Sequence, residues 1–111
     1  MMNANARRCP RSPFVAIVLA ADPSSHIAFA AKTTNISLGG CHIASDGQLA
    51  AGTTITIELV HKGESFHAVG EIVYSKIGAG MGIRFIRVSQ GNREVLARWI
   101  EELQPAEYSL P

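Results

Sequence analysis

The sequence predicts an all-β domain with one C-terminal helix, and two observations support that fold class. First, short apolar or alternating segments recur between residues 14 and 86, separated by turns rich in Gly, Asp and Ser. Regularly spaced short strands are typical of a β-barrel or sandwich. Second, the hydrophobic period becomes helical only after this region. Because no helical segment interrupts the strands, the pattern argues against a βαβ architecture.

Six strands are expected, in the order in which these segments occur. The clearest one covers residues 53–60, where Ile55, Ile57 and Leu59 alternate with polar residues. A hairpin turn at residues 62–64 leads to a long strand, in which Gly70 predicts a bend or bulge. The expected strands are residues 14–19, 27–33, 41–44, 53–60, 66–75 and 81–86.

The last segment is predicted to form a single amphipathic helix. Ser89 is the expected N-cap, and Pro105 lies just beyond the expected end of the helix. Such a helix needs an apolar surface to cover, and a barrel mouth or an open sheet edge supplies one. The apolar residues of its stripe are Val95, Leu96, Trp99, Ile100 and Leu103.

Length and charge limit the organisation of the chain and its partners. The chain has 111 residues and a net charge of +1. We expect one domain over residues 7–104, with a flexible N-terminal tail at residues 1–6 and a C-terminal tail at residues 105–111. General binding to DNA, RNA or anionic membrane requires the neutralisation of many phosphates, so no such partner is expected. An anionic ligand must instead be held by a local cluster of arginines. Both a monomer and a homodimer are compatible with the sequence.

The N-terminal segment has two interpretations. Arginines followed by an apolar run, with Ala28-Phe29-Ala30 further on, resemble a secretory signal. However, the run ends at Asp22-Pro23, and it is far shorter than the ~20 residues that span a bilayer. We therefore interpret the run as a buried strand and expect a cytoplasmic protein without membrane insertion. Cys9 and Cys41 are too few for a disulfide framework or a four-cysteine zinc site, and we expect reduced thiols.

Two short clusters are candidates for binding chemistry. The first is the arginine cluster before the first strand, and the second is a polar turn between the second and third strands. The planar fork of arginine donates two parallel hydrogen bonds, which suits phosphate and the O6/N7 edge of guanine. Taken alone, the arginines are more typical of a solvated terminus than of a binding site, and the second cluster is typical of an ordinary turn. The first cluster contains Arg7, Arg8 and Arg11, and the second contains Asn35, Ser37 and Gly40.

In this order the two clusters resemble the hallmark of the PilZ domain family, over residues 7 to about 103. Members of that family carry R-x-x-x-R near the N-terminus, followed by [D/N]-x-S-x-x-G. Arg7 and Arg11 match the first motif, with Arg8 inside it, and the run N-I-S-L-G-G at residues 35–40 matches the second. The run M-G-I-R-F-I at residues 81–86 is similar to the closing strand of the family.

The resemblance implies a six-stranded antiparallel barrel with a C-terminal helix, and cyclic di-GMP as the ligand. It implies that Arg7 and Arg11, with a contribution from Arg8, grip guanine edges and phosphates. It further implies that Asn35 and Ser37 form hydrogen bonds with the ligand, while Gly40 leaves room for it. The expected role is that of a receptor or adaptor that converts ligand binding into altered contact with an effector protein, in the control of motility, biofilm or exopolysaccharide.

Three alternative functions remain at this point. A PilZ-like protein-interaction module that works without nucleotide is the main one, although such domains typically lack the arginine motif. A small RNA-binding barrel uses exposed aromatic residues on a basic face, which the 6% aromatic content and near-neutral charge disfavour. An enzyme is not expected, because no nucleophile elbow, phosphate loop or paired-carboxylate motif is present. The four histidines have no metal-ligand spacing, so neither a metal nor another cofactor is expected.

Overall fold

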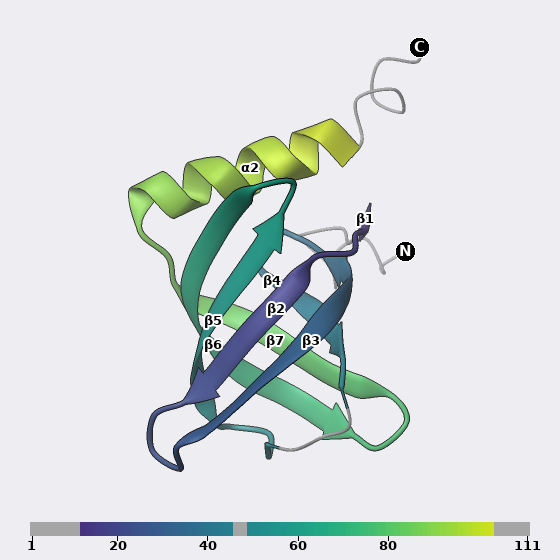
Figure 1. Ribbon diagram of the computed structural model, residues 1–111, viewed down its shortest axis with the longest axis vertical. Helices are drawn as coiled ribbons and strands as arrows, with labels where there is room; N and C mark the ends of the chain where they lie inside the picture. The colour runs from purple at the N-terminus through teal and green to yellow at the C-terminus, as the bar shows by residue number, and fades with distance from the viewer. Residues whose placement is uncertain (1–11, 46–48, 104–111) are drawn as a thin grey trace, which may run out of the picture.

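The computed structural model describes residues 12–45 and 49–103. Within these ranges the chain forms seven strands and one helix, which Figure 1 labels. The elements are β1 (Ser12–Pro13), β2 (Ile17–Asp22), β3 (Ile27–Ile36), β4 (Gly40–Ala44), β5 (Thr54–His61), β6 (Glu64–Lys76), β7 (Gly80–Arg87) and α2 (Gln90–Leu103).

Six of the strands close into an antiparallel barrel (Figure 1). Neighbouring strands follow the order β3-β2-β5-β6-β7-β4, and β4 pairs back with β3. This closure pairs both edges of the sheet and so protects it from unwanted strand addition. The two-residue strand β1 lies outside the ring and pairs with β3. The predicted six-stranded antiparallel barrel with a C-terminal helix is confirmed.

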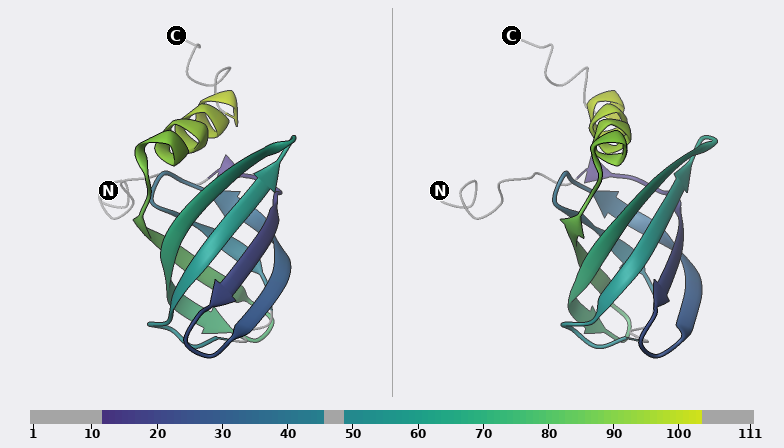
Figure 2. Two further views of the ribbon diagram at one scale, coloured as in Figure 1. Left: turned by 60° about the vertical axis from the view of Figure 1, so that its left-hand side comes forward. Right: turned by 90° about the vertical axis from the view of Figure 1, so that its left-hand side faces the viewer.

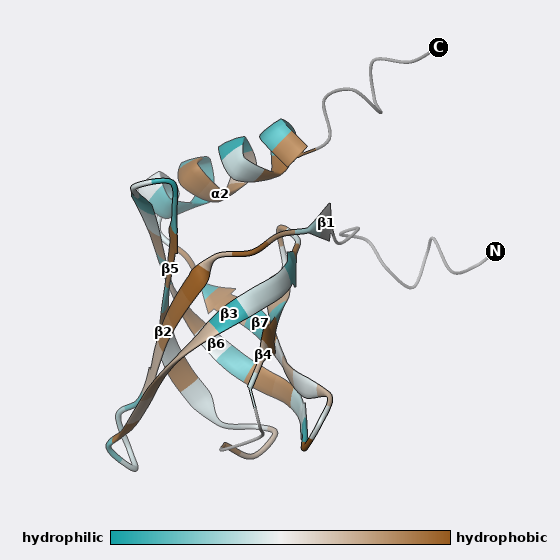
Figure 3. Cartoon of the chain, turned by 45° about the vertical axis from the view of Figure 1, so that its right-hand side comes forward, coloured by the Kyte–Doolittle hydropathy of each residue, from teal (hydrophilic) through white to brown (hydrophobic). Residues whose placement is uncertain are grey.

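The alternation of apolar and polar residues places the hydrophobic core inside the barrel. In β5, Ile55, Ile57 and Leu59 are at most 2% exposed, while Thr56 faces solvent. Figure 3 shows the same change between hydrophobic and hydrophilic residues along other strands. Because successive side chains point to opposite faces of a strand, the alternation in the sequence predicts which side chains face the barrel interior.

The hairpin turn and the bulge in the long strand are also confirmed. Lys62 and Gly63 both have positive φ, 52° and 80°, as the two central residues of a type I′ turn require. The pairing of β6 with β7 shifts register between Val69 and Gly70. A Cβ at Gly70 would lie 2.8 Å from the Cγ2 atom of Ile83, so the close approach of β7 explains the glycine.

The first strand begins later than predicted, at Ile17 instead of Phe14. The reason is the side chain of Thr33, which is 2% exposed. It takes the place of some backbone hydrogen bonds between residues 14–16 and β3. Its Oγ1 donates a hydrogen bond to the carbonyl oxygen of Phe14 at 2.6 Å and accepts one from the amide of Ala16 at 2.8 Å. Residues 14–16 are therefore tied to β3 without forming a regular strand.

Helix α2 lies across one end of the barrel (Figures 1 and 2). It begins directly after Ser89, as predicted, and the Ser89 carbonyl accepts a hydrogen bond from the amide of Arg93 at 2.9 Å. Trp99 is 1% exposed and fills the barrel mouth. Its ring centroid lies 5.5 Å from that of Phe14 and 5.4 Å from that of His61. Val95, Leu96, Trp99 and Ile100 of the predicted stripe therefore dock on the core, whereas Leu103 at the end of the helix is exposed.

Two polar contacts join the docked helix to the start of β6. The indole Nε1 of Trp99 donates a hydrogen bond to the Glu64 carboxylate at 2.9 Å, and Arg98 forms an ion pair with the same group. The Trp99 hydrogen bond, reinforced by Arg98, lowers the pKa of Glu64. Glu64 is the first residue of β6, so the hairpin between β5 and β6 holds the helix.

Candidate ligand-binding site

The polar turn between β3 and β4 begins with a β-bulge. The pairing of β3 with β4 shifts register between Thr33 and Asn35. Thr33 and Ile36 are buried, whereas Thr34 is exposed and Asn35 is half-buried. The bulge therefore turns two consecutive side chains, those of Thr34 and Asn35, towards the outer surface of the barrel. Bulges of this kind re-aim side chains and are common beside functional sites.

Ser37 closes the turn. Its hydroxyl accepts hydrogen bonds from the amides of Gly39 at 3.1 Å and Gly40 at 3.2 Å, and lies 3.3 Å from the carbonyl oxygen of Gly40. Ser37 is only 3% exposed. Because β3 ends at Ile36, Ser37 lies outside the extended strand that contains Asn35. The hydroxyl contacts of Ser37 give this motif residue a structural role, in agreement with the turn that the sequence indicated for this motif.

Gly40 is explained by the close packing of β4 against β7. A Cβ at this position would lie 2.0 Å from the carbonyl oxygen of Ile83, a distance that no side chain tolerates. The backbone of Gly40 is not left-handed, so positive φ is not the reason for the glycine. The amide of Phe85 also donates a hydrogen bond to the carbonyl of Gly39 at 2.9 Å, which fixes the turn to β7.

Strand β1 brings the chain that follows the arginine motif beside this turn. Ser12 pairs with Ile36, and Pro13 pairs with Asn35. Arg7, Arg8 and Arg11 lie outside the described residues. Arg11 directly precedes Ser12 in the sequence, and Ser12 is the first described residue beside the second motif.

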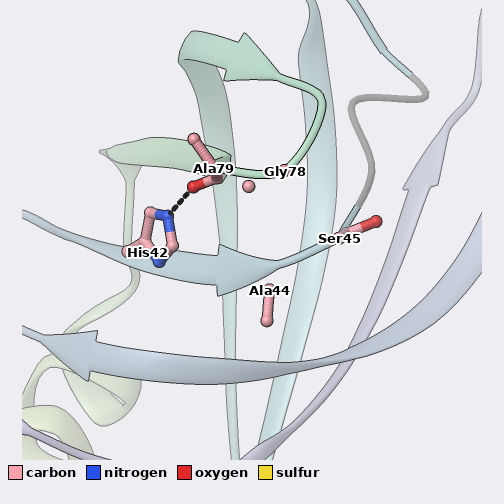
Figure 4. A pocket seen from close by; sticks show the side chains of 6 residues that line it. His42, Ala44, Ser45, Gly78 and Ala79 are labelled. Carbon is pink, nitrogen blue, oxygen red and sulfur yellow. Dashed lines mark hydrogen bonds between the residues drawn. The ribbon is translucent and has the colours of Figure 1, made fainter.

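His42 extends the polar surface from the turn to the connection between β6 and β7. It pairs with Asn35 across the two strands. Its Nε2 lies 2.6 Å from the carbonyl oxygen of Ala79, and its Nδ1 lies 2.7 Å from Oγ1 of Thr34. Because a carbonyl oxygen only accepts hydrogen bonds, Nε2 carries a proton. Figure 4 shows the His42–Ala79 contact at the wall of a pocket of about 370 Å³. This pocket is lined by His42, Ala44, Ser45, Gly78, Ala79 and Gly80.

Two cations beside the site were not singled out from the sequence. Arg84 pairs with Gly40 across β7 and β4, and its guanidinium forms an ion pair with Glu71. Lys32 pairs with Ala44, is exposed and borders an apolar groove of about 450 Å³. The signal for Arg84 was available, because Arg84 lies between apolar residues in the predicted strand 81–86 and should face outward.

No group of three His, Cys, Asp or Glu side chains within residues 12–45 and 49–103 could hold a metal ion. Within the same ranges, no helix has the length and apolar character that a membrane span requires.

These features define a closed six-stranded antiparallel barrel with one helix across its end. The PilZ domain model matches residues 5–102, which is most of the chain. The chain therefore belongs to the PilZ domain family, whose members are receptor domains for cyclic di-GMP. No curated protein matches the sequence.

Solved structures share the fold at low sequence identity. The PilZ domain of CeSA from a cellulose-synthesizing bacterium has a TM-score of 0.65 at 18% identity, over 88% of this chain and 98% of that one. The PilZ domain of YcgR from Escherichia coli, solved with c-di-GMP, has a TM-score of 0.68 at 18% identity, over 94% and 98%. The Bacillus subtilis inhibitor of motility, MotI/DgrA, has a TM-score of 0.72 at 14% identity, over 90% of this chain and 51% of that one.

Proposed function

We propose that this protein is a non-enzymatic receptor that binds cyclic di-GMP where the arginine motif meets the turn between β3 and β4. The main supporting observation is the pairing of Pro13 with Asn35, because it brings the chain after the arginine motif to the second motif. The proposed functional unit is residues 7–104, with Arg7, Arg8, Arg11, Asn35, Ser37 and Gly40 as its ligand site.

The residues of this site divide into two roles. Arg7 and Arg11, with Arg8, supply guanidinium forks for guanine edges and phosphates, and such charge-assisted bidentate contacts are the strong class of hydrogen bond. Asn35, which the bulge turns outward, supplies amide donors and an acceptor. Ser37 and Gly40 contribute mainly by holding the turn, through the hydroxyl contacts and the close approach to β7 described above.

The biological output of the receptor passes to another protein. In this proposal, the ligand and the arm that contacts it form a composite surface for an effector protein. We propose control of motility, biofilm or exopolysaccharide as the process, in the cytoplasm. The proposal is compatible with a monomer or a homodimer, and with one bound ligand or an intercalated pair.

A thermal shift assay tests the proposed ligand. A ligand that binds only the folded state raises the melting temperature by mass action. Cyclic di-GMP at about 100 times its Kd should add about 2.7 kcal/mol of stability. Cyclic di-AMP should shift the melting temperature much less, because adenine presents a donor where guanine O6 accepts the arginine fork. Equal shifts with both nucleotides, or none, would count against the proposal and favour a protein-interaction module that works without nucleotide.

A further inference from the structure

Strand β2 and the segment just before it carry apolar side chains on the outer surface of the barrel. Val15, Ile17 and Leu19 point outward and are 46% to 65% exposed, while the residues between them fill the core. The neighbouring strand β5 has the ordinary pattern, with Thr54 and Thr56 at its exposed outer positions. An antiparallel strand with one solvated face alternates apolar and polar residues, so the outer face of β2 has the composition of a covered face.

The apolar surface extends to both neighbours of β2. Ile17 pairs with Val60 of β5, and Leu19 pairs with Ala30 of β3. We refer to Val15, Ile17, Leu19, Ala30 and Val60 as the β2 patch. Figures 1 and 2 show α2 across the end of the barrel, so the helix leaves this side open. The apolar groove of about 450 Å³ described above lies at the edge of the patch, and Ile17 and Ala30 line it.

Two opposite charges lie at opposite corners of the β2 patch. Lys32 of β3 pairs with Ile17, whereas Glu58 of β5 pairs with Leu19. Lys32 is exposed, and among the described residues its ammonium group forms no ion pair. The Glu58 carboxylate lies 3.4 Å from Nε2 of His67, a partner that is charged only when it is protonated. Both charges are therefore available to a partner from outside the chain.

This arrangement of charges is complementary to itself. The line from Lys32 to Glu58 passes over the centre of the patch, between Ile17 and Leu19. A two-fold axis that lies in the contact plane and crosses this line at a right angle exchanges its two ends. Lys32 of each copy then faces Glu58 of the other copy, as an isologous interface requires. The other two corners are apolar and lie close to the axis, so no like charges meet.

From this symmetry we infer that the β2 patch is the interface of a homodimer, closed at both ends by a Lys32–Glu58 pair between the copies. The patch extends about 13 Å from Val15 to Leu19 and about 10 Å across three strands. Two convex barrels whose β2 strands cross at a steep angle touch over a small area of this kind. The area is below the roughly 800 Å² that each partner buries in a standard interface, so the dimer should dissociate on dilution.

Sedimentation equilibrium of the ligand-free protein tests the interface. The wild-type mass should rise from that of one chain towards that of two between micromolar and millimolar protein. Leu19→Thr gives β2 the outer character of β5 and should weaken the dimer at least about 10-fold. Ile77→Thr replaces an 88% exposed aliphatic residue in the turn between β6 and β7, and as the matched control it should dimerise like the wild type. Circular dichroism verifies the fold of each variant.

Charge reversal distinguishes this dimer from nonspecific apolar association. Lys32→Glu and Glu58→Lys should each weaken self-association at least about 10-fold, because like charges then meet at both ends of the interface. An equimolar mixture of the two variants should form a heterodimer about as stable as the wild-type dimer. In that mixture the two altered residues face each other, and so do the two unaltered ones.

The possible results of these experiments separate the dimer from other occupants of the β2 patch. A wild type that stays monomeric at millimolar concentration would overturn the inference and leave the patch to a different protein. Unchanged self-association of Leu19→Thr, or charge-reversed variants that do not associate when mixed, would also overturn it. Because no nucleotide is present, none of these results bears on the proposed binding of cyclic di-GMP.

Discussion

Pro13 lies opposite Asn35 in the pairing of β1 with β3. The arginine motif ends at Arg11, two residues before Pro13, and Asn35 is the first residue of the second motif. The amide of Phe14 continues the contact with a 3.1 Å hydrogen bond to the carbonyl of Thr34. This contact places Ser12 and Pro13, which follow the arginine motif in the sequence, beside the first residue of the second motif.

Replacing the motif arginines should weaken binding without changing the fold. We expect Arg7→Ala and Arg11→Ala each to cost about 1–3 kcal/mol of binding free energy. Arg11→Lys should fail similarly, because an ammonium group cannot reproduce the two parallel hydrogen bonds of the fork. Calorimetric titration measures the loss, and circular dichroism verifies the fold.

The control for charge alone is Arg87→Ala, which removes an exposed arginine at the end of β7. It should bind cyclic di-GMP like the wild type. If Arg7→Ala and Arg11→Ala also bind normally, the arginines are only a solvated terminus and the proposed site is wrong.

Gly40→Ala should destabilise the barrel, whether or not a ligand is present. The new Cβ would collide with the backbone carbonyl of Ile83, which cannot move aside as a flexible side chain can. Overpacking of this kind costs about 1–3 kcal/mol. Urea unfolding of the ligand-free protein measures the change in the free energy of unfolding. Gly91→Ala in α2 is the matched control, because a Cβ there meets no atom within 4 Å. Equal stability of both variants would show that β4 and β7 separate easily at Gly40.

The sequence was sufficient for the barrel and its core but not for the details of the site. Strict alternation in residues 53–60 predicted which face of β5 is buried, and the helical stripe with Trp99 predicted the docked face of α2. Both predictions depend on local periodicity, which the sequence shows directly. The start of β2 was missed because the Thr33 side chain replaces backbone hydrogen bonds, a long-range contact that has no local signal.

The roles within the second motif illustrate the same limit. An N-x-S pattern cannot reveal whether the segment remains extended, and the observed end of β3 at Ile36 turns Ser37 inward. The pairing of Asn35 with His42 likewise depends on the register of β3 with β4 and on the bulge between Thr33 and Asn35. Register between strands is a tertiary property that local periodicity does not show.

Trp99→Ala should destabilise the protein by about 3–5 kcal/mol, the range for loss of a large buried aromatic side chain. Trp99 contacts the rings of Phe14, His61 and Phe66 at the barrel mouth. Urea unfolding of the wild type and the variant gives the difference. Ala97→Ser, at an exposed position two residues away, is the control and should change little. A Trp99→Ala variant that unfolds like the wild type would mean that α2 docks on another surface in solution.

The contact between Glu64 and Trp99 should make stability depend on pH in the acid range. Since the pKa of Glu64 is lower in the folded state, its carboxylate stabilises the fold above its ordinary, unfolded pKa of 4.5. That contribution is lost as the pH falls through the lower folded pKa. At pH 7 the wild type should therefore melt above Glu64→Gln. The difference should shrink as the pH falls below about 4, and a difference that stays constant down to pH 3 would contradict this assignment.

Calorimetric titration of the purified wild-type protein with cyclic di-GMP tests the central claim most directly. The account predicts saturable heat with a Kd below about 100 µM, which corresponds to a binding free energy of roughly 5–6 kcal/mol or more. GTP and cyclic di-AMP titrated under the same conditions should give much weaker binding. No heat with cyclic di-GMP at about 100 µM, at two temperatures so that a zero enthalpy is not mistaken for absence of binding, would contradict it.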